Sequence, residues 1–270
     1  MAISPEDFTI ETFRELKGFS GNIHRLLGKD AIQLKLYYEG TVTQIDLFVN
    51  NCEFWNEFKK KYTNYDSIYL EKFGSQLWAR DQERPQSLNK KTYDSFINKL
   101  FRLSILEKKI NDIETLKQYL SINHWPSIIN DHVRTQLIVK FLDGSIYLEE
   151  VLSNLASYYN LKFKSEFKSK ERGYHAIHCY VDIPMSLSDI NYSPASHIIS
   201  FEIQISTQLQ EMIYQITHPF YETQRVELTN QKEMPWQWDY DKQEFAVGHI
   251  GHIIQYLEGT LVNMRNTHLK

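Results

Sequence analysis

Two spacings of apolar residues follow one another along the chain after residue 89. Apolar residues three and four positions apart predict helices, whereas apolar residues at every second position predict strands. The first spacing predicts helices over 92–104, 109–122, 145–159, 207–222 and 248–265. The second predicts strands over 134–142, 161–167, 173–183 and 197–206. Because helices and strands alternate, we expect an α/β (α+β) fold with a mixed β-sheet of about five strands flanked by helices.

The pattern is less regular before residue 89. The segments 32–38 and 43–49 are rich in branched and aromatic residues, and Glu39-Gly40 between them is a turn signal. We therefore expect a β-hairpin here. A second turn signal, Asp143-Gly144, is expected to end the strand over 134–142. Two further helices are predicted over 52–62 and 65–80.

The composition is that of a soluble globular protein. Of the 270 residues, 42% are hydrophobic and 24% are charged. Only two cysteines are present, too few for a disulfide framework, so we expect a cytoplasmic location. No apolar run approaches the roughly 20 residues of a membrane helix, and no membrane association is expected. We divide the chain into an N-terminal subregion of undetermined role, 1–85, and a main domain, 86–270.

The strand over 173–183 begins with GYHAIHCYV, in which two histidines and a cysteine lie close together. Alternation along a strand puts His175 and Cys179 on one face, and Tyr174 and His178 on the other. Because at most two of these ligands converge, we do not expect a structural zinc site.

The strand over 197–206 has the clearest alternation in the chain. One face is apolar, and the other carries Glu202, Gln204 and Ser206. The helix that follows is predicted to bury its apolar residues, which are Leu209, Met212, Ile213, Ile216 and Phe220. The polar strand face has two interpretations, one wall of a ligand cleft or a solvated sheet face.

Charge adds one local feature to this picture. The formal net charge of −4 argues against a protein that coats nucleic acid in general. A basic cluster nevertheless precedes Gly173, and its members are Lys162, Lys164, Lys168, Lys170 and Arg172. A basic loop followed by a glycine and an exposed tyrosine suits a nucleotide, with cations on the phosphates and the ring under the base. The alternative is a solvated basic loop.

Four segments of the main domain carry polar residues at spacings that recur together in one known family. The first is KTYDSFINK, with Lys91, Ser95 and Lys99, and the second is Asp131 before a strand. The third is KERGYHAIH over 170–178, and the fourth is FEIQISTQLQEMIYQITH over 201–218. In this order they resemble the synthetase domain of the RelA/SpoT alarmone family, over about residues 85–265.

The resemblance implies an activity and a fold. Family members have a nucleotidyltransferase-like synthetase fold and are pyrophosphokinases, which transfer pyrophosphate from ATP to the 3′-hydroxyl of GDP or GTP. Such chemistry needs charge neutralisation and positioning of the phosphates. A toxin-like relative that modifies the tRNA 3′ end or an adenine nucleotide remains an alternative. A catalytically silent relative that binds a nucleotide or a partner protein is another.

The resemblance also implies roles for the donor side. Asp131 and Glu202 would hold Mg²⁺, an ion that prefers oxygen ligands. Glu202 would in addition accept the proton of the attacking hydroxyl. The residues that would bind the ATP donor are Lys91, Ser95, Lys99 and Arg134.

On the acceptor side, the resemblance implies that Tyr174 stacks on the acceptor base beside Gly173. Contacts to the acceptor are implied for Lys170, Arg172, His178 and Gln204. His218 would support the site.

The chain departs from the family at three positions. Asn89, Gln136 and Ser206 stand where the family commonly has arginine. Loss of guanidinium groups removes phosphate pairing and base stacking on the donor side, which favours the silent alternative. The expected partners are ATP and a nucleotide acceptor, with tRNA, an antitoxin or regulatory protein, and a second copy of the chain left open.

Overall fold

A computed structural model describes residues 9–79, 88–121, 125–169, 173–188, 193–226 and 237–268. Within these ranges, the side chains at 218–226, 243–244 and 268 are not described. The chain forms two compact units. Unit 1 consists of Met1–Cys52, Leu88–Arg134 and Val181–Glu202, and unit 2 of Glu53–Ser87, Thr135–Tyr180 and Ile203–Lys270. The division expected at residue 85 concerns the roles of two parts of the chain, and it stays a prediction.

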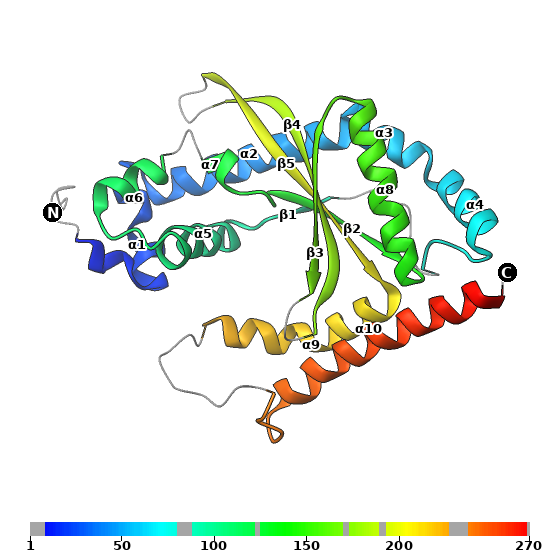
Figure 1. Cartoon of the computed structure of the whole chain (residues 1–270). Helices are drawn as coiled ribbons and strands as arrows, with labels where there is room; N and C mark the ends of the chain where they lie inside the picture. The colour runs from blue at the N-terminus through cyan, green and yellow to red at the C-terminus, as the bar shows by residue number, and fades with distance from the viewer. Residues whose placement is uncertain are drawn as a thin grey trace. The chain divides into compact units, whose positions relative to one another are not determined.

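Unit 1 is mainly helical. Its elements are η2 (Ile10–Phe13), α1 (Leu16–Leu26), α2 (Ala31–Asn51), β1 (Asn89–Lys90), α5 (Tyr93–Phe101), the π-helical turn η3 (Arg102–Glu107), α6 (Ile113–Tyr119) and α7 (Trp125–Ile128). Helix α5 packs against α1 and α2 (Figure 1). Aromatic rings fill this contact, and the Phe19 ring of α1 lies 5.4 Å from the Phe101 ring of α5. The helix predicted over 109–122 is shorter than expected and corresponds to α6.

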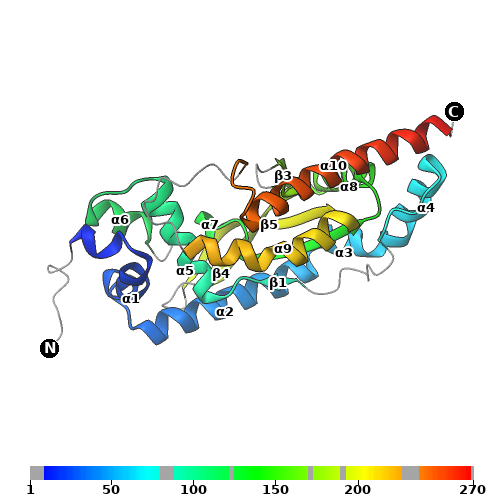
Figure 2. The ribbon, with the colours of Figure 1, turned by 90° about the horizontal axis from the view of Figure 1, so that it is seen from below.

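Unit 2 contains the remaining helices. They are α3 (Glu53–Lys60), α4 (Tyr62–Phe73), α8 (Leu142–Tyr158), α9 (Gln208–Val226) and α10 (Gln243–His268). Helix α10 packs against both α8 and α9, and Figure 2 shows α9 and α10 side by side. The strand β3 (Lys162–Ser169) packs against α8. No helix in the described parts of either unit has the length and apolar character that a bilayer crossing requires.

The sheet has the strand order β1-β2-β5-β4-β3. Strands β2 (Val133–Val139), β4 (His175–Ser188) and β5 (Pro194–Thr207) each contribute residues to both units. Strand β1 pairs with β2 in antiparallel register, with Asn89 opposite Arg134. The predicted class, a mixed sheet of about five strands flanked by helices, is confirmed.

The predicted faces of β4 are also confirmed. His175, Ile177 and Cys179 are buried, whereas Tyr174 and His178 are only partly buried. Alternation of this kind follows from the period of two of a β-strand. The two histidines therefore lie on opposite faces of the strand.

The predicted hairpin over 32–49 is wrong, because this segment is the continuous helix α2. Apolar residues at 32, 34 and 36 imitate strand alternation, but Ile32 and Leu36 are exposed. The buried residues instead recur every three or four positions, at Leu34, Tyr38, Thr41, Val42, Ile45 and Val49. Asp30 caps the helix, because its carboxylate accepts hydrogen bonds from the backbone N–H groups of residues 32 and 33.

Two predicted boundaries are also corrected. The helix expected over 65–80 ends at Phe73, because Gly74 adopts a left-handed conformation with φ of 65° and closes the helix. Asp143-Gly144 is not a turn, since both residues belong to the first turn of α8. Gly144 lies there because a Cβ atom would come within 3.1 Å of Leu77 and 3.2 Å of Val139.

The helical conformation of α2 predicts that Gly40→Ala stabilises the protein. A Cβ at Gly40 would meet nothing within 4 Å. Alanine in a helix interior is favoured over glycine, so we expect the free energy of unfolding in urea to rise by about 0.5–1 kcal/mol. Gly28→Ala serves as the control and should destabilise, because Gly28 has φ of +65°. Destabilisation by Gly40→Ala would instead support a turn at this position.

Candidate functional site

Unit 1 contains a compact cluster of charged side chains. Lys91 follows β1, Lys99 lies on α5, and Asp131 directly precedes β2. The Lys91 Nζ donates to Asp131 Oδ2 at 2.8 Å, and the Lys99 Nζ donates to Asp131 Oδ1 at 2.7 Å. Two residues that were predicted to bind the donor, Lys91 and Lys99, thus converge on Asp131, which was predicted to hold a metal ion.

The cluster carries an excess of positive charge. Burial by itself would raise the pKa of Asp131, but Lys91 and Lys99 outweigh this effect and lower the pKa to about 2. Burial lowers the pKa of Lys91, and the positive charges of Lys99 and Arg134 lower it further, although Asp131 opposes the shift. Several cations around one carboxylate favour the binding of an additional anion, such as a phosphate.

The other donor residues occupy different places. Arg134 is exposed on β2. The Ser95 hydroxyl accepts a hydrogen bond from the Thr92 hydroxyl at 2.9 Å, and its backbone N–H donates to the same Thr92 oxygen. Thr92 is the N-cap of α5, so the contacts of Ser95 belong to helix capping. Its role in donor binding stays a prediction.

Glu202 of β5 is buried, with only 4% of its surface exposed. The interpretation of this strand face as solvated is therefore wrong at Glu202, and also at Ser206, which is 7% exposed. A carboxylate in this position is removed from most of the solvent, so neighbouring groups decide what it can bind. Its predicted catalytic role has no direct test in the structure.

Asp131, one of the two predicted Mg²⁺ ligands, already has two cationic partners. Both oxygens of Asp131 accept hydrogen bonds from ammonium groups, so a divalent cation there would face two positive charges. Across the described ranges, no group of three or more His, Cys, Asp or Glu side chains is arranged to hold a metal ion. As they lie, the side chains do not fit a resident Mg²⁺, which stays a prediction from the resemblance.

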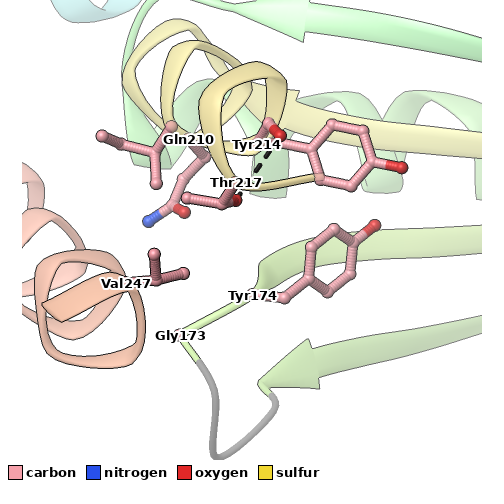
Figure 3. A pocket seen from close by; sticks show the side chains of 7 residues that line it. Gly173, Tyr174, Gln210, Tyr214, Thr217 and Val247 are labelled. Carbon is pink, nitrogen blue, oxygen red and sulfur yellow. Dashed lines mark hydrogen bonds between the residues drawn. The ribbon is translucent and has the colours of Figure 1, made fainter. Parts of the chain in front are cut away.

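Unit 2 contains a small open pocket at the start of β4 (Figure 3). Its volume is about 250 Å³, including space open to solvent. The residues that line it are Gly173, Tyr174, Gln210, Ile213, Tyr214, Thr217 and Val247. The space that a water-sized group can occupy is only about 10 Å³, so this is a shallow hollow rather than a cavity for a whole ligand.

Aromatic and polar groups meet at the mouth of this pocket. Tyr174 Oη and His178 Nε2 share a hydrogen bond of 2.9 Å, and the tautomer of His178 decides which atom donates. The Tyr174 ring also lies 5.9 Å from the Tyr214 ring of α9. Figure 3 shows these two rings facing each other across the pocket. Two of the predicted acceptor residues, Tyr174 and His178, are therefore in direct contact.

Backbone contact between β4 and α10 forms one wall of the pocket. Gly173 has φ of +79°, which favours glycine. A Cβ on Gly173 would lie 2.5 Å from the Gly248 carbonyl oxygen, and one on Gly251 would lie 2.2 Å from the Gly173 carbonyl oxygen. The close approach of α10 to the start of β4 therefore requires glycine at Gly173 and Gly251, because a Cβ atom at either position would overlap backbone atoms.

The predicted inner face of α9 is wrong at three of its five residues, whereas Ile213 is half-buried and the side chain of Phe220 lies outside the described ones. Leu209, Met212 and Ile216 are 39%, 53% and 65% exposed, whereas Gln210 and Thr217 are buried. The inner side of α9 is mixed: Gln210 Nε2 donates to Gln255 Oε1 of α10 at 3.3 Å, and Ile213 lines the pocket beside it. Sequence analysis missed Gln210, Tyr214 and Thr217. Their helical spacing was a usable signal, but apolar content alone was used to choose the face.

Two of the three positions that lack arginine meet in unit 2. Gln136 Nε2 donates to Ser206 Oγ at 3.2 Å and also to the Glu211 carboxylate. Gln215 donates to the same carboxylate at 3.1 Å. Among the side chains that the structure describes, this cluster has a carboxylate and no cation, so it does not suit a phosphate. The third position, Asn89, lies in β1 opposite Arg134, which supplies a guanidinium group there.

The remaining predicted acceptor residues have different outcomes. Lys170 and Arg172 lie outside the described residues, and the side chain of His218 is not described. Gln204 is partly buried on β5. Within the basic cluster, Lys164 and Lys168 both form ion pairs with Glu166 on β3, so part of its charge is neutralised locally.

Comparison with known proteins was made at three levels. No family model and no curated protein matches the chain. Among solved structures, it is similar to small alarmone synthetase 2 from Bacillus subtilis, with 17% identity over 86% of this chain and 97% of that chain, and a TM-score of 0.47. It is also similar to small alarmone synthetase 1 from the same organism, with 14% identity over 87% of this chain and 96% of that chain, and a TM-score of 0.49. A third similar structure is a GTP pyrophosphokinase family protein from Streptococcus pneumoniae, with 15% identity over 87% of this chain and 94% of that chain, and a TM-score of 0.46. These identities and TM-scores do not decide a function for this chain.

The close approach of Gly173 and Gly251 predicts a specific effect of Gly251→Ala. The added methyl group would meet backbone atoms, which cannot move aside as a side chain can. We expect the free energy of unfolding in urea to fall by about 1–3 kcal/mol. Gly259→Ala on the same helix is the matched control, because a Cβ there meets nothing within 4 Å. Equal effects of the two variants would contradict the contact.

A buried carboxyl group on α10 predicts a pH dependence of stability. Glu258 is 1% exposed, and neither carboxylate oxygen has a hydrogen-bond partner among the described residues. Burial raises its pKa from 4.5 to about 7, and the nearby Thr207 opposes the shift only in part. The folded state therefore holds a proton that the unfolded chain has already lost between these two pH values.

We expect the stability of the wild type to fall as pH rises from about 4.5 through 7, because ionisation favours the unfolded chain. Glu258→Gln removes this contribution. Urea unfolding at pH 5 and pH 8 should show the variant gaining about 1–3 kcal/mol relative to the wild type at the higher pH. A difference between variant and wild type that does not change with pH would disprove the effect.

Proposed function

We propose that the chain is a pyrophosphokinase, which transfers pyrophosphate from ATP to the 3′-hydroxyl of a guanine nucleotide, GDP or GTP. The observation that carries the proposal is the convergence of Lys91 and Lys99 on Asp131. These residues match the donor motif of the family that the sequence resembles. Their meeting makes a cationic site from three separate segments of the chain.

The cations of unit 1 bind the donor polyphosphate in this proposal. The ammonium groups of Lys91 and Lys99, with the guanidinium group of Arg134, neutralise the charge that develops on the phosphates. Asp131 keeps the two lysines together. The 3′-oxygen of the acceptor forms a bond to the β-phosphorus of ATP. At the same time, the bond between the β-phosphorus and the oxygen that bridges to the α-phosphate breaks, and AMP leaves with the electron pair of the broken bond. Glu202 takes the proton of the attacking hydroxyl.

The pocket of unit 2 binds the acceptor base. Tyr174 lines this pocket and offers a ring on which the base stacks. The hydrogen bond between Tyr174 and His178 orients that ring. Gly173 and Gly251 keep the wall of the pocket close to α10.

The test is transfer of label from ATP to an acceptor. Purified protein is incubated with ATP labelled in the β-phosphate, with Mg²⁺, and in turn with GDP, GTP, ATP or deacylated tRNA. We expect a labelled guanine nucleotide, and a loss of about 100-fold or more in Lys99→Ala and Glu202→Gln. Lys35→Ala is the control, because this lysine of α2 is exposed and pairs with Glu39. Label in tRNA or in an adenine nucleotide would show that the acceptor is not a guanine nucleotide, while the transfer reaction itself would stand.

A catalytically silent nucleotide-binding protein is the second candidate. It is favoured by the uncharged side chains of Gln136 and Ser206, which contact each other beside Glu211. Arginine at these two positions would instead supply contacts to the ATP donor. The same assay separates the two candidates. Binding of ATP without transfer to any of the four acceptors would leave the silent function and exclude the pyrophosphokinase.

A further inference from the structure

The N-terminal helix α2 reaches the charged cluster through one side chain. Tyr38 is 1% exposed, and its hydroxyl donates a hydrogen bond to the backbone carbonyl of Lys91 at 2.9 Å. The backbone N–H of Lys91 donates to the His132 carbonyl at 2.9 Å. The peptide groups on both sides of the Lys91 Cα are therefore held, one by His132 just before β2 and the other by Tyr38.

Tyr38 also contacts the helix that carries the second lysine. Its ring stacks on Phe96 of α5, with 4.2 Å between centroids and 23° between planes. Phe96 lies one turn before Lys99, so the position of the Tyr38 ring affects where Lys99 emerges. One side chain thus contacts the backbone of one lysine and the helix of the other.

A buried aromatic cluster holds Tyr38 in this place. The Trp125 ring lies 5.4 Å from the Tyr38 ring, and the His132 ring lies 6.2 Å from it. His132 is fully buried, and burial lowers its pKa to about 3, so this ring is uncharged. Burial and the nearby Asp131 charge raise the pKa of Tyr38, which keeps its hydroxyl protonated and able to donate.

We propose that Tyr38 is a positioning residue for the donor site, which fixes the Lys91 backbone and the α5 helix so that both ammonium groups meet the donor polyphosphate. The inference rests on the proposed function and gives residues of the N-terminal subregion a part in it. Lysine has a flexible four-carbon stem, so the place of its charge depends on how firmly its backbone is held. Misplacement of a binding group by about 1 Å can cost two orders of magnitude in rate.

The closing experiment compares Tyr38→Phe with Tyr93→Phe. The first variant keeps the ring and removes the bond to Lys91. The second removes a hydroxyl from the same cluster, since the Tyr93 ring lies 5.8 Å from that of Tyr38. Amide hydrogen exchange at residues 90–92 is measured without nucleotide, and the dissociation constant for ATP is measured by calorimetry.

We expect faster exchange at the Lys91 amide in Tyr38→Phe, and a dissociation constant for ATP raised about 5- to 10-fold. Tyr93→Phe should change neither. The affinity for GDP should stay the same in both variants, because a general loss of structure would lower both affinities.

Three results would overturn the inference. Unchanged exchange would show that Tyr38 does not hold Lys91. Faster exchange with unchanged ATP affinity would show that its hold does not matter to the donor. Equal effects of the two variants would show only packing. A wild-type protein that binds no ATP would instead refute the proposed function and the donor role with it, whereas exchange at Lys91 would still report on the structural link.

Discussion

The arrangement of unit 1 depends on one buried carboxylate that holds two ammonium groups. A charge removed from water is costly unless it is paired, so Asp131 requires Lys91 and Lys99 to be near it. These lysines come from the turn after β1 and from α5, and the backbone of Lys91 is in turn held by Tyr38 of α2. The pairing thus unites three distant segments of sequence. It also leaves a surplus of positive charge, which favours the approach of an anion.

Unit 2 is organised around a contact between backbones. The carbonyl of Gly173 comes so close to Gly251 that no side chain fits between β4 and α10. Helices α9 and α10 meet through a hydrogen bond between Gln210 and Gln255, while Ile213 and Val247 line the pocket beside them. The backbone contact places Tyr174 and Tyr214 at the pocket mouth.

Prediction from sequence succeeded where one side of an element is buried and the other is not. Buried and partly exposed residues alternate along β4, as the sequence pattern predicted. The helix predicted over 145–159 from its apolar spacing corresponds to α8. It failed for α2, whose exposed Ile32 and Leu36 imitate a strand when read with Leu34. It failed again for the face of α9. Apolar content predicts the buried side of a helix only when the helix packs on an apolar surface, and α9 does not.

The sequence by itself determined most elements after residue 89, the two faces of β4, and the residues Lys91, Lys99 and Asp131 as related positions. The elements and the faces follow from local spacing, which the chain carries whatever its surroundings, whereas the relation of the three residues came from the resemblance to a known family. Only the tertiary structure decided that the lysines share one carboxylate, that Tyr38 supports them, and that Tyr214 joins Tyr174. Such contacts join residues far apart along the chain, and they are set by how helices and strands pack rather than by the period of any one element.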